Sequence, residues 1–221
     1  MSCLIISPHL DDAILSLGGF LSLMQNLNCK VITIFNTAWS IDKDIKEWKS
    51  ITKKNLAEEK KAMRELRCDF KFLNYPEALL RGYIRWNDAL DLKKDKKLFE
   101  KITRDLLPEV EKYDNIFLPR GIGKHVDHLL IREMFTAIPK SQNSIFFYED
   151  LPYSCYEEFE EYDKEMNILI DISRVINIKT KLLNIYKSQL DMDTIEMVEQ
   201  HSLKLGRKGR NCERIWKLLE Y

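Results

Sequence analysis

Short apolar runs alternate with longer amphipathic segments along most of this chain. Residues 3–6 have the length and β-branched content of a buried strand. In the segment that follows, Ile14, Leu17, Leu21 and Met24 recur on one face of a helix. A strand, a helix and a strand in this order predict a right-handed crossover and a parallel sheet. Similar patterns predict further strands at 30–35, 70–73, 115–119, 144–148 and 167–172, and further helices at 51–66, 90–110 (interrupted near Pro108), 129–135, 175–190 and 211–219.

The chain length limits the number of domains. At 221 residues it is long enough for one sizeable core and short for two independent domains. We therefore expect a single α/β domain over residues 1–221, with a Rossmann-like three-layer fold in which helices flank a mostly parallel sheet. The first strand-to-helix turn lacks the G-x-G-x-x-G pattern of a dinucleotide site. Gly18 and Gly19 fall inside the predicted helix, and we interpret them as positions where it approaches the sheet closely.

The composition indicates which classes of partner and which cellular location to expect. Lys plus Arg and Asp plus Glu number 35 each, and the two signs are interspersed, which argues against a general nucleic-acid or anionic-membrane binder. The five cysteines form no C-x-x-C pair, which favours reduced thiols in a cytoplasmic protein. No secretory signal pattern precedes the first strand, and no apolar stretch approaches about 18 residues. Neither export nor a membrane span is therefore expected.

The first strand-to-helix turn carries one imidazole and two carboxylates, His9, Asp11 and Asp12. His9 and Asp12 can converge on one divalent ion because the turn bends the chain between them, and zinc accepts this pair of ligands. Asp11 would then point elsewhere, where a carboxylate that does not ligate the ion can accept a proton from an attacking water. The alternative is that both carboxylates only stabilise the first turn of the helix.

A second strand-to-helix turn has the sequence G-I-G-K-H-V-D-H and ends at His128. If the two strands are parallel neighbours, their carboxyl ends lie side by side, and His128 completes a set of three ligands with His9 and Asp12. Three protein ligands leave a fourth position for water, which is typical of a catalytic zinc site, and ferrous iron is the alternative metal. His125 is then free to donate a proton or hydrogen bond to the reacting group, and Asp127 to orient a nearby imidazole.

Together the two turns resemble the motifs of the PIG-L/LmbE-like family of metal-dependent deacetylases, which act on N-acetylglucosamine-type sugars. The motifs are P-H-x-D-D at 8–12, with Gly18-Gly19 behind it, and G-x-G-x-H-V-D-H at 121–128. The resemblance runs through nearly the whole chain, by way of F-Y-E-D-L-P at 147–152, S-Q at 188–189 and E-R at 213–214. It implies a zinc-dependent amidohydrolase with His9, Asp12 and His128 as metal ligands, Asp11 as general base and His125 as electrostatic or acid partner.

Three positions depart from the family pattern. Leu10 stands where the family often has Pro, Ala13 where it often has Glu, and Tyr186 where some members carry His. None of these positions is a proposed ligand. They therefore put the identity of the substrate in question more than the type of reaction.

Other candidates are single residues near the expected carboxyl edge of the sheet. Arg81 could hold a sugar hydroxyl or a phosphate, although most arginines are simply exposed. Glu149 could contact the sugar or a ligating imidazole, although a role in the turn before Pro152 is an equal alternative. The polar connection at 37–49, with its two tryptophans, is a candidate cover for the site, and His201 is expected at the surface.

The expected function is metal-dependent removal of an N-acetyl group from an N-acetylglucosamine-type amino sugar or its conjugate. The expected partner is thus a small amino-sugar substrate, and a homo-oligomer is left open. Two alternatives remain. One is a hydrolase of another amide or of an ester. The other is a non-catalytic Rossmann-like binding module in which His9 and Asp12 serve only as turn caps.

Overall fold

The computed structural model describes residues 2–25, 27–37, 45–138, 143–157 and 164–219. Within these residues the chain forms one seven-stranded sheet with the order β3-β2-β1-β4-β5-β7-β6. The first five strands run parallel to one another, and β7 is antiparallel to both of its neighbours. The strands are β1 (Ser2–Ser7), β2 (Asn28–Thr37), β3 (Asp69–Pro76), β4 (Asn115–Pro119), β5 (Ser144–Tyr148), β6 (Glu165–Asp171) and β7 (Cys212–Leu218).

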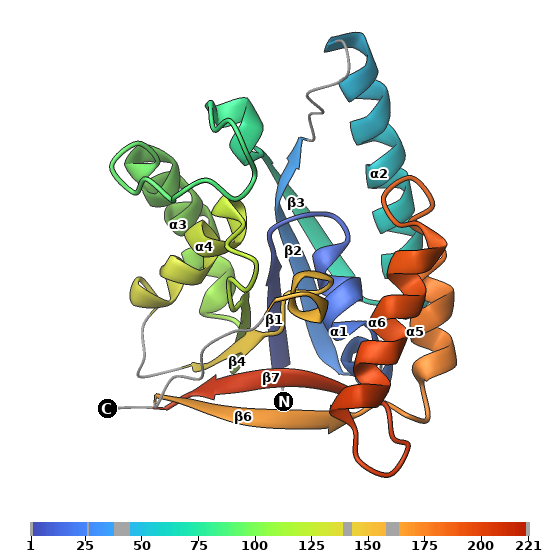
Figure 1. Cartoon of the computed structure of the whole chain (residues 1–221). Helices are drawn as coiled ribbons and strands as arrows, with labels where there is room; N and C mark the ends of the chain where they lie inside the picture. Colours follow the sequence, from blue (N-terminus) through green and yellow to red (C-terminus); the bar gives the residue numbers. More distant parts are fainter. Residues whose placement is uncertain (1, 26, 38–44, 139–142, 158–163, 220–221) are drawn as a thin grey trace.

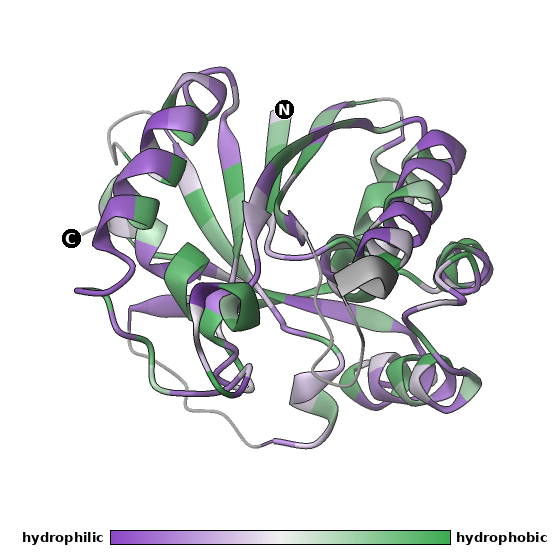
Figure 2. Cartoon of the chain, turned by 90° about the horizontal axis from the view of Figure 1, so that it is seen from above, coloured by the Kyte–Doolittle hydropathy of each residue, from purple (hydrophilic) through white to green (hydrophobic). Residues whose placement is uncertain are grey.

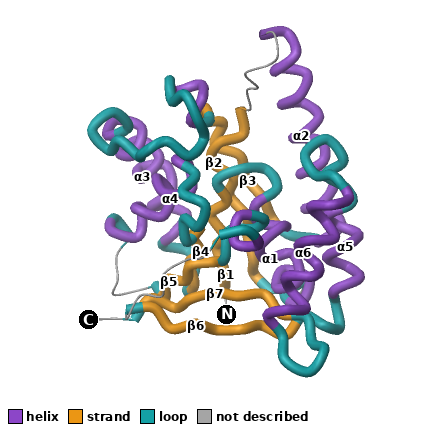
Figure 3. Tube along the Cα trace, in the orientation of Figure 1, coloured by secondary structure: helices purple, strands orange, loops and turns teal. Residues whose placement is uncertain are grey.

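Helices cover both faces of the sheet, as Figures 1 and 3 show. One face carries α3 (Lys96–Val110) and α4 (Val126–Glu133). The other carries α1 (Asp12–Leu23), α2 (Ile45–Leu66), α5 (Ile176–Leu183) and α6 (Met192–Leu205). The ribbons of the helices carry both hydrophobic and hydrophilic residues (Figure 2), and a large cluster of buried hydrophobic residues lies on each side of the sheet. The expected α/β three-layer fold is confirmed.

Two details of the sequence analysis are wrong. Residues 211–219 do not form a last helix, because 212–218 are strand β7, inserted between β5 and β6. Trp216 pairs with Phe147 of one neighbour and with Asn167 of the other, and this non-local pairing overrides the local pattern. Pro108 also does not interrupt its helix, since it lies inside the last turn of α3. None of the described helices is long and apolar enough to cross a membrane.

Helix α1 is kinked, and a buried ion pair stabilises the kink. Leu17 has a non-helical backbone, with φ −129° and ψ 15°. The backbone N–H groups of Gly19 and Phe20 donate instead to the two carboxylate oxygens of Glu213, at 2.8 and 2.7 Å. The Lys179 ammonium donates to the same carboxylate at 2.7 Å. Glu213 of β7 therefore caps the second half of α1, and Lys179 of α5 balances its charge.

The glycines of α1 allow a close approach, although to a different element from the one expected. A Cβ on Gly19 would lie 2.7 Å from the side chain of Ile172, the residue that follows β6. A Cβ on Gly18 would meet Lys179 at 3.4 Å. The absence of side chains here thus lets α1 pack against the β6–α5 connection as well as the sheet.

Replacing Lys179 with Met should destabilise the fold. The substitution leaves the Glu213 carboxylate buried without its cation, which costs about 3–5 kcal/mol in comparable cases. Urea unfolding would measure the loss. The matched control is Lys96→Met, since Lys96 pairs with Glu100 at 4.0 Å on the surface and its loss should change the free energy of unfolding by no more than about 0.5 kcal/mol. Equal stability of the two variants would show that the buried pair does not support the kink.

Candidate metal centre and active site

Strand pairing brings the two motif turns together. β1 pairs in parallel with β4, with Ile5 opposite Phe117, so the loops that follow both strands leave the same edge of the sheet. The backbone N–H of His9 donates to Asp12 Oδ2 at 2.8 Å, which folds the first loop so that these two side chains lie next to each other. His128 reaches them from the first turn of α4.

The three predicted ligand atoms form a nearly equilateral triangle. His9 Nδ1 and His128 Nε2 each lie 3.2 Å from Asp12 Oδ2 and 3.4 Å from one another. In a tetrahedral site with bonds of about 2.0–2.1 Å, neighbouring ligand atoms are about 3.3 Å apart. The donor set and its spacing thus fit zinc or a similar divalent ion without rearrangement.

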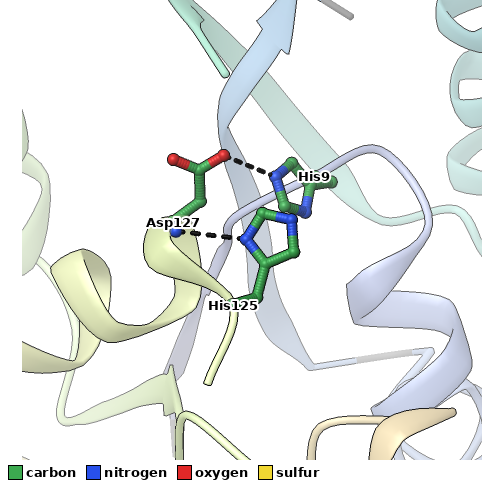
Figure 4. Close-up of side chains that lie close together, drawn as sticks. All are labelled: His9, His125 and Asp127. Atoms are coloured by element: carbon green, nitrogen blue, oxygen red, sulfur yellow. Dashed lines mark hydrogen bonds and ion pairs between the residues drawn. The ribbon is translucent and has the colours of Figure 1, made fainter. Parts of the chain in front are cut away.

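A buried carboxylate orients each imidazole of this triangle. His9 Nε2 contacts Asp127 Oδ2 at 2.9 Å, as Figure 4 shows, and His128 Nδ1 contacts Asp150 Oδ1 at 2.6 Å. A carboxylate can only accept, so it holds the N–H on that nitrogen and leaves the lone pair of the other nitrogen for the metal. The structure therefore gives Asp127 the orienting contact that the sequence analysis expected and gives Asp150 the same contact.

A second group, His9, His125 and Asp127, also lies within reach of one ion. Its members are already engaged. His125 Nδ1 accepts the backbone N–H of Asp127 at 3.1 Å (Figure 4) and so caps α4. The Asp127 carboxylate accepts from Arg81 and from the backbone N–H of Ala78. The triangle of His9, Asp12 and His128 is therefore the better metal site.

His125 is held as a neutral hydrogen-bond donor. Burial lowers the pKa of His125 to about 2, and the neighbouring His9 and His128 act in the same direction. With Nδ1 occupied as an acceptor, the ring proton lies on Nε2. His125 also lines the adjacent pocket.

The electrostatics of the triangle favour positive charge beside Asp12. Burial lowers the pKa of His128, but the Asp12 carboxylate and the hydrogen bonds to Asp12 and Asp150 raise it to about 9. Asp12 and Asp127 likewise outweigh burial and hold the pKa of His9 well above its usual value. The pKa of Asp12 is held well below its usual range, since the two imidazoles outweigh its burial.

Asp11 is placed beside the triangle without belonging to it. It makes no capping hydrogen bond to α1, although it occupies the N-cap position. Burial, followed by the charge of Asp12, raises the pKa of Asp11 to about 6. A partly exposed carboxylate with this pKa can exchange protons near neutral pH, and the absence of a capping bond argues against the purely structural alternative.

A pocket of about 340 Å³ opens next to His125. Trp86 stacks against the His125 ring with centroids 5.5 Å apart and against Tyr153 at 5.2 Å. Gly123 makes room for Tyr153, because a Cβ there would lie 2.6 Å from the tyrosine side chain. Neither aromatic residue was predicted from the sequence, since nothing in the local pattern around them indicates a site. The lining residues are Glu77, Ala78, Leu79, Trp86, His125 and Tyr153.

Several weaker expectations gain no support. Arg81 is committed to Asp127, Asp95 and the Pro76 carbonyl, and it does not line the pocket. Glu149 is buried, and its Oε1 contacts His201 Nε2 at 3.0 Å.

Two further expectations have other outcomes. His201 is partly buried against Glu149, so its expected place at the surface is wrong. The polar connection at 37–49 was a candidate cover for the site. Its residues 38–44, which include Trp39, lie outside the described residues, and so does the side chain of Trp48.

Comparison with known proteins identifies the family. A model of the PIG-L family, described as GlcNAc-PI de-N-acetylase, matches residues 4–138, which is more than half of the chain. The chain belongs to the PIG-L family. All six residues of the two motif turns discussed above lie within the matched range.

Relatives match over most of their length. A 2'-N-acetylparomamine deacetylase of Streptomyces fradiae is 24% identical, and the match covers 96% of this chain and 88% of that protein. A 2'-N-acetylparomamine deacetylase of Niallia circulans is 25% identical, and the match covers 84% of this chain and 82% of that protein. Among solved structures, a deacetylase from teicoplanin biosynthesis in complex with teicoplanin has a TM-score of 0.83 at 19% identity, covering 100% of this chain and 99% of that one. At this identity the structural likeness shows the shared fold.

Removing a ligand should remove the metal. We expect His128→Ala to lose stoichiometric zinc, whereas Asp11→Asn should retain it, because Asp11 lies outside the ligand triangle. Elemental analysis of protein purified without chelator and dialysed against zinc would measure this. His201→Ala is the control for removal of a histidine elsewhere. A His128→Ala protein with a full complement of zinc would rule out this site.

Metal binding should release protons. At pH 7 the raised pKa values of His9 and His128 mean that both bind protons in the metal-free protein, and zinc must displace them. We expect release of between one and two protons per zinc, with affinity rising about tenfold per pH unit for each proton displaced. Titration calorimetry in buffers of different ionisation enthalpy would count the protons. His125→Ala should leave the count unchanged, and binding without proton release would contradict the proposed ligands.

Proposed function

We propose that this protein is a zinc-dependent deacetylase that removes the acetyl group from an N-acetylglucosamine-type amino sugar or its conjugate. The observation that carries the proposal is the triangle of His9, Asp12 and His128, with ligand atoms 3.2–3.4 Å apart, beside a pocket that the neutral His125 lines. Family membership and two relatives named 2'-N-acetylparomamine deacetylase support the same substrate class.

The metal assignment follows from the ligand set. His9, Asp12 and His128 would hold the ion, and two imidazoles with one carboxylate suit zinc, with ferrous iron as the alternative. When bound, a divalent metal supplies Lewis acidity, which polarises the acetyl carbonyl and makes water a stronger acid. Asp127 and Asp150 keep both imidazoles in the orientation that binding requires.

The protein's own groups perform the proton transfers. Asp11 accepts a proton from the water that attacks the acetyl carbon. The Nε2–H of His125 donates to the carbonyl oxygen as negative charge develops on it, an interaction that strengthens in the transition state. The carbon–nitrogen bond then breaks, and the proton held by Asp11 passes to the departing amine. The products are acetate and the free amino sugar.

The pocket wall suits a sugar ring. Trp86 and Tyr153 present aromatic surface beside His125, and Glu77 is also among the lining residues. A pocket of about 340 Å³ lies at the lower end of the range for small-ligand sites, which favours one sugar residue in the pocket and the rest of a conjugate outside it.

All five cysteines are free, which supports the proposed cytoplasmic location.

The decisive experiment compares substrates. The zinc-loaded protein should release acetate from N-acetylglucosamine conjugates, among them 2'-N-acetylparomamine, and should act poorly on simple amides and on esters of the same acyl group. Asp11→Asn should lower kcat by about 10²- to 10⁴-fold with zinc still bound, because the proton acceptor is lost. Faster turnover of simple esters or amides than of every N-acetyl sugar would replace this proposal with a different hydrolase.

A further inference from the structure

Arg81 connects two parts of the site that belong to different segments of the chain. It ends the short 3-10 helix Ala78–Arg81 that follows β3, and its guanidinium is almost fully buried. One nitrogen, Nη1, donates to Asp127 Oδ1 at 2.5 Å and to the Pro76 carbonyl at 3.0 Å. Nε and Nη2 donate to the two oxygens of Asp95 at 3.3 and 3.1 Å. The planar fork of donors thus bridges two buried carboxylates at once.

On one side, this bridge leads to the metal triangle. Asp127 is fully buried, and its other oxygen, Oδ2, contacts His9 Nε2 at 2.9 Å and accepts the backbone N–H of Ala78 at 3.1 Å. Arg81 therefore holds the carboxylate that sets the orientation of His9.

On the other side, the bridge leads to the pocket wall. Asp95 Oδ2 also accepts from the Tyr83 hydroxyl at 2.9 Å, and that hydroxyl in turn accepts the backbone N–H of Asp91 at 3.2 Å. These bonds close the connection from 77 to 95, which carries Trp86. Without Arg81, both ends of this connection would lose their common partner.

We propose that Arg81 is a positioning residue that acts through Asp127 on the metal ligand His9 and through Asp95 on the connection that carries Trp86. The residue expected from sequence to hold a sugar hydroxyl instead positions both the metal site and the sugar-binding wall, each through its own carboxylate. The part that concerns the wall rests on the proposed deacetylase function, whereas the part that concerns the metal does not.

If Arg81 acts on the metal site through Asp127, the losses of zinc affinity caused by substituting the two residues should not add. Zinc affinity, measured by competition with a chromophoric chelator, should fall about 10- to 100-fold in Arg81→Met and in Asp127→Asn. The double variant should bind zinc no more weakly than Asp127→Asn alone, because Arg81 acts only through Asp127. Additive losses, or an Arg81→Met protein that binds zinc as tightly as the parent, would overturn the proposal.

If Arg81 acts on the pocket wall through Asp95, substituting Asp95 should affect substrate binding, whereas substituting Asp127 should affect zinc binding. Asp95→Asn should raise the KM for the N-acetyl sugar while changing zinc affinity less than about twofold. If Arg81→Met fails to fold, Arg81→Lys serves in its place, since a lysine can reach one carboxylate but cannot bridge two. An Asp95→Asn protein that loses zinc affinity as strongly as Arg81→Met would show a merely structural role and overturn the separate action of Arg81 through the two carboxylates. If the parent protein does not deacetylate any N-acetyl sugar, the proposed function is wrong. The zinc affinities of the Arg81 and Asp127 single and double variants then still test the role of Arg81 at the metal site.

Discussion

The site depends on the parallel pairing of β1 with β4. These two strands lie far apart in the sequence, yet Cys3, Leu4 and Ile5 pair with Asn115, Ile116 and Phe117 at the centre of the sheet. Both strands are buried, so their register is fixed by packing on both faces. Their carboxyl ends must then deliver the P-H-x-D-D and H-V-D-H turns to one place, as the general rule for ligand sites in such sheets requires.

Burial of charge explains how the delivered residues are arranged. Asp12, Asp127 and Asp150 are nearly or fully buried, and an isolated carboxylate in such surroundings is costly. Asp127 is balanced by Arg81, while Asp12 faces His9 and His128, whose pKa values are raised in response. The site thus already favours about two positive charges next to Asp12. A divalent ion that displaces two protons supplies the same charge, which is why the ligand triangle suits such an ion.

The sequence predicted this part of the molecule because its signals are local. Each ligand lies in the turn between an apolar strand and a helix or in the first turn of that helix, and the number of histidines is small. The parts that it missed depend on pairing across the fold. Strand β7 has no parallel-sheet pattern of its own, and Trp86 and Tyr153 meet His125 only when the connection after β3 and the turn after β5 converge. Arg81 was found as a candidate, but its partners Asp95 and Asp127 could not be read from spacing.

The kink in α1 shows how a late segment shapes the start of the site. The straight continuation of α1 would use the N–H groups of Gly19 and Phe20 inside the helix, whereas here Glu213 accepts both. The first half of α1, which begins at Asp12, is therefore a short helix whose direction is set separately from the second half. Since Glu213 lies on the antiparallel strand β7, that strand does more than extend the sheet: its carboxylate fixes the direction change that lets α1 begin at the metal loop and still pack against α5.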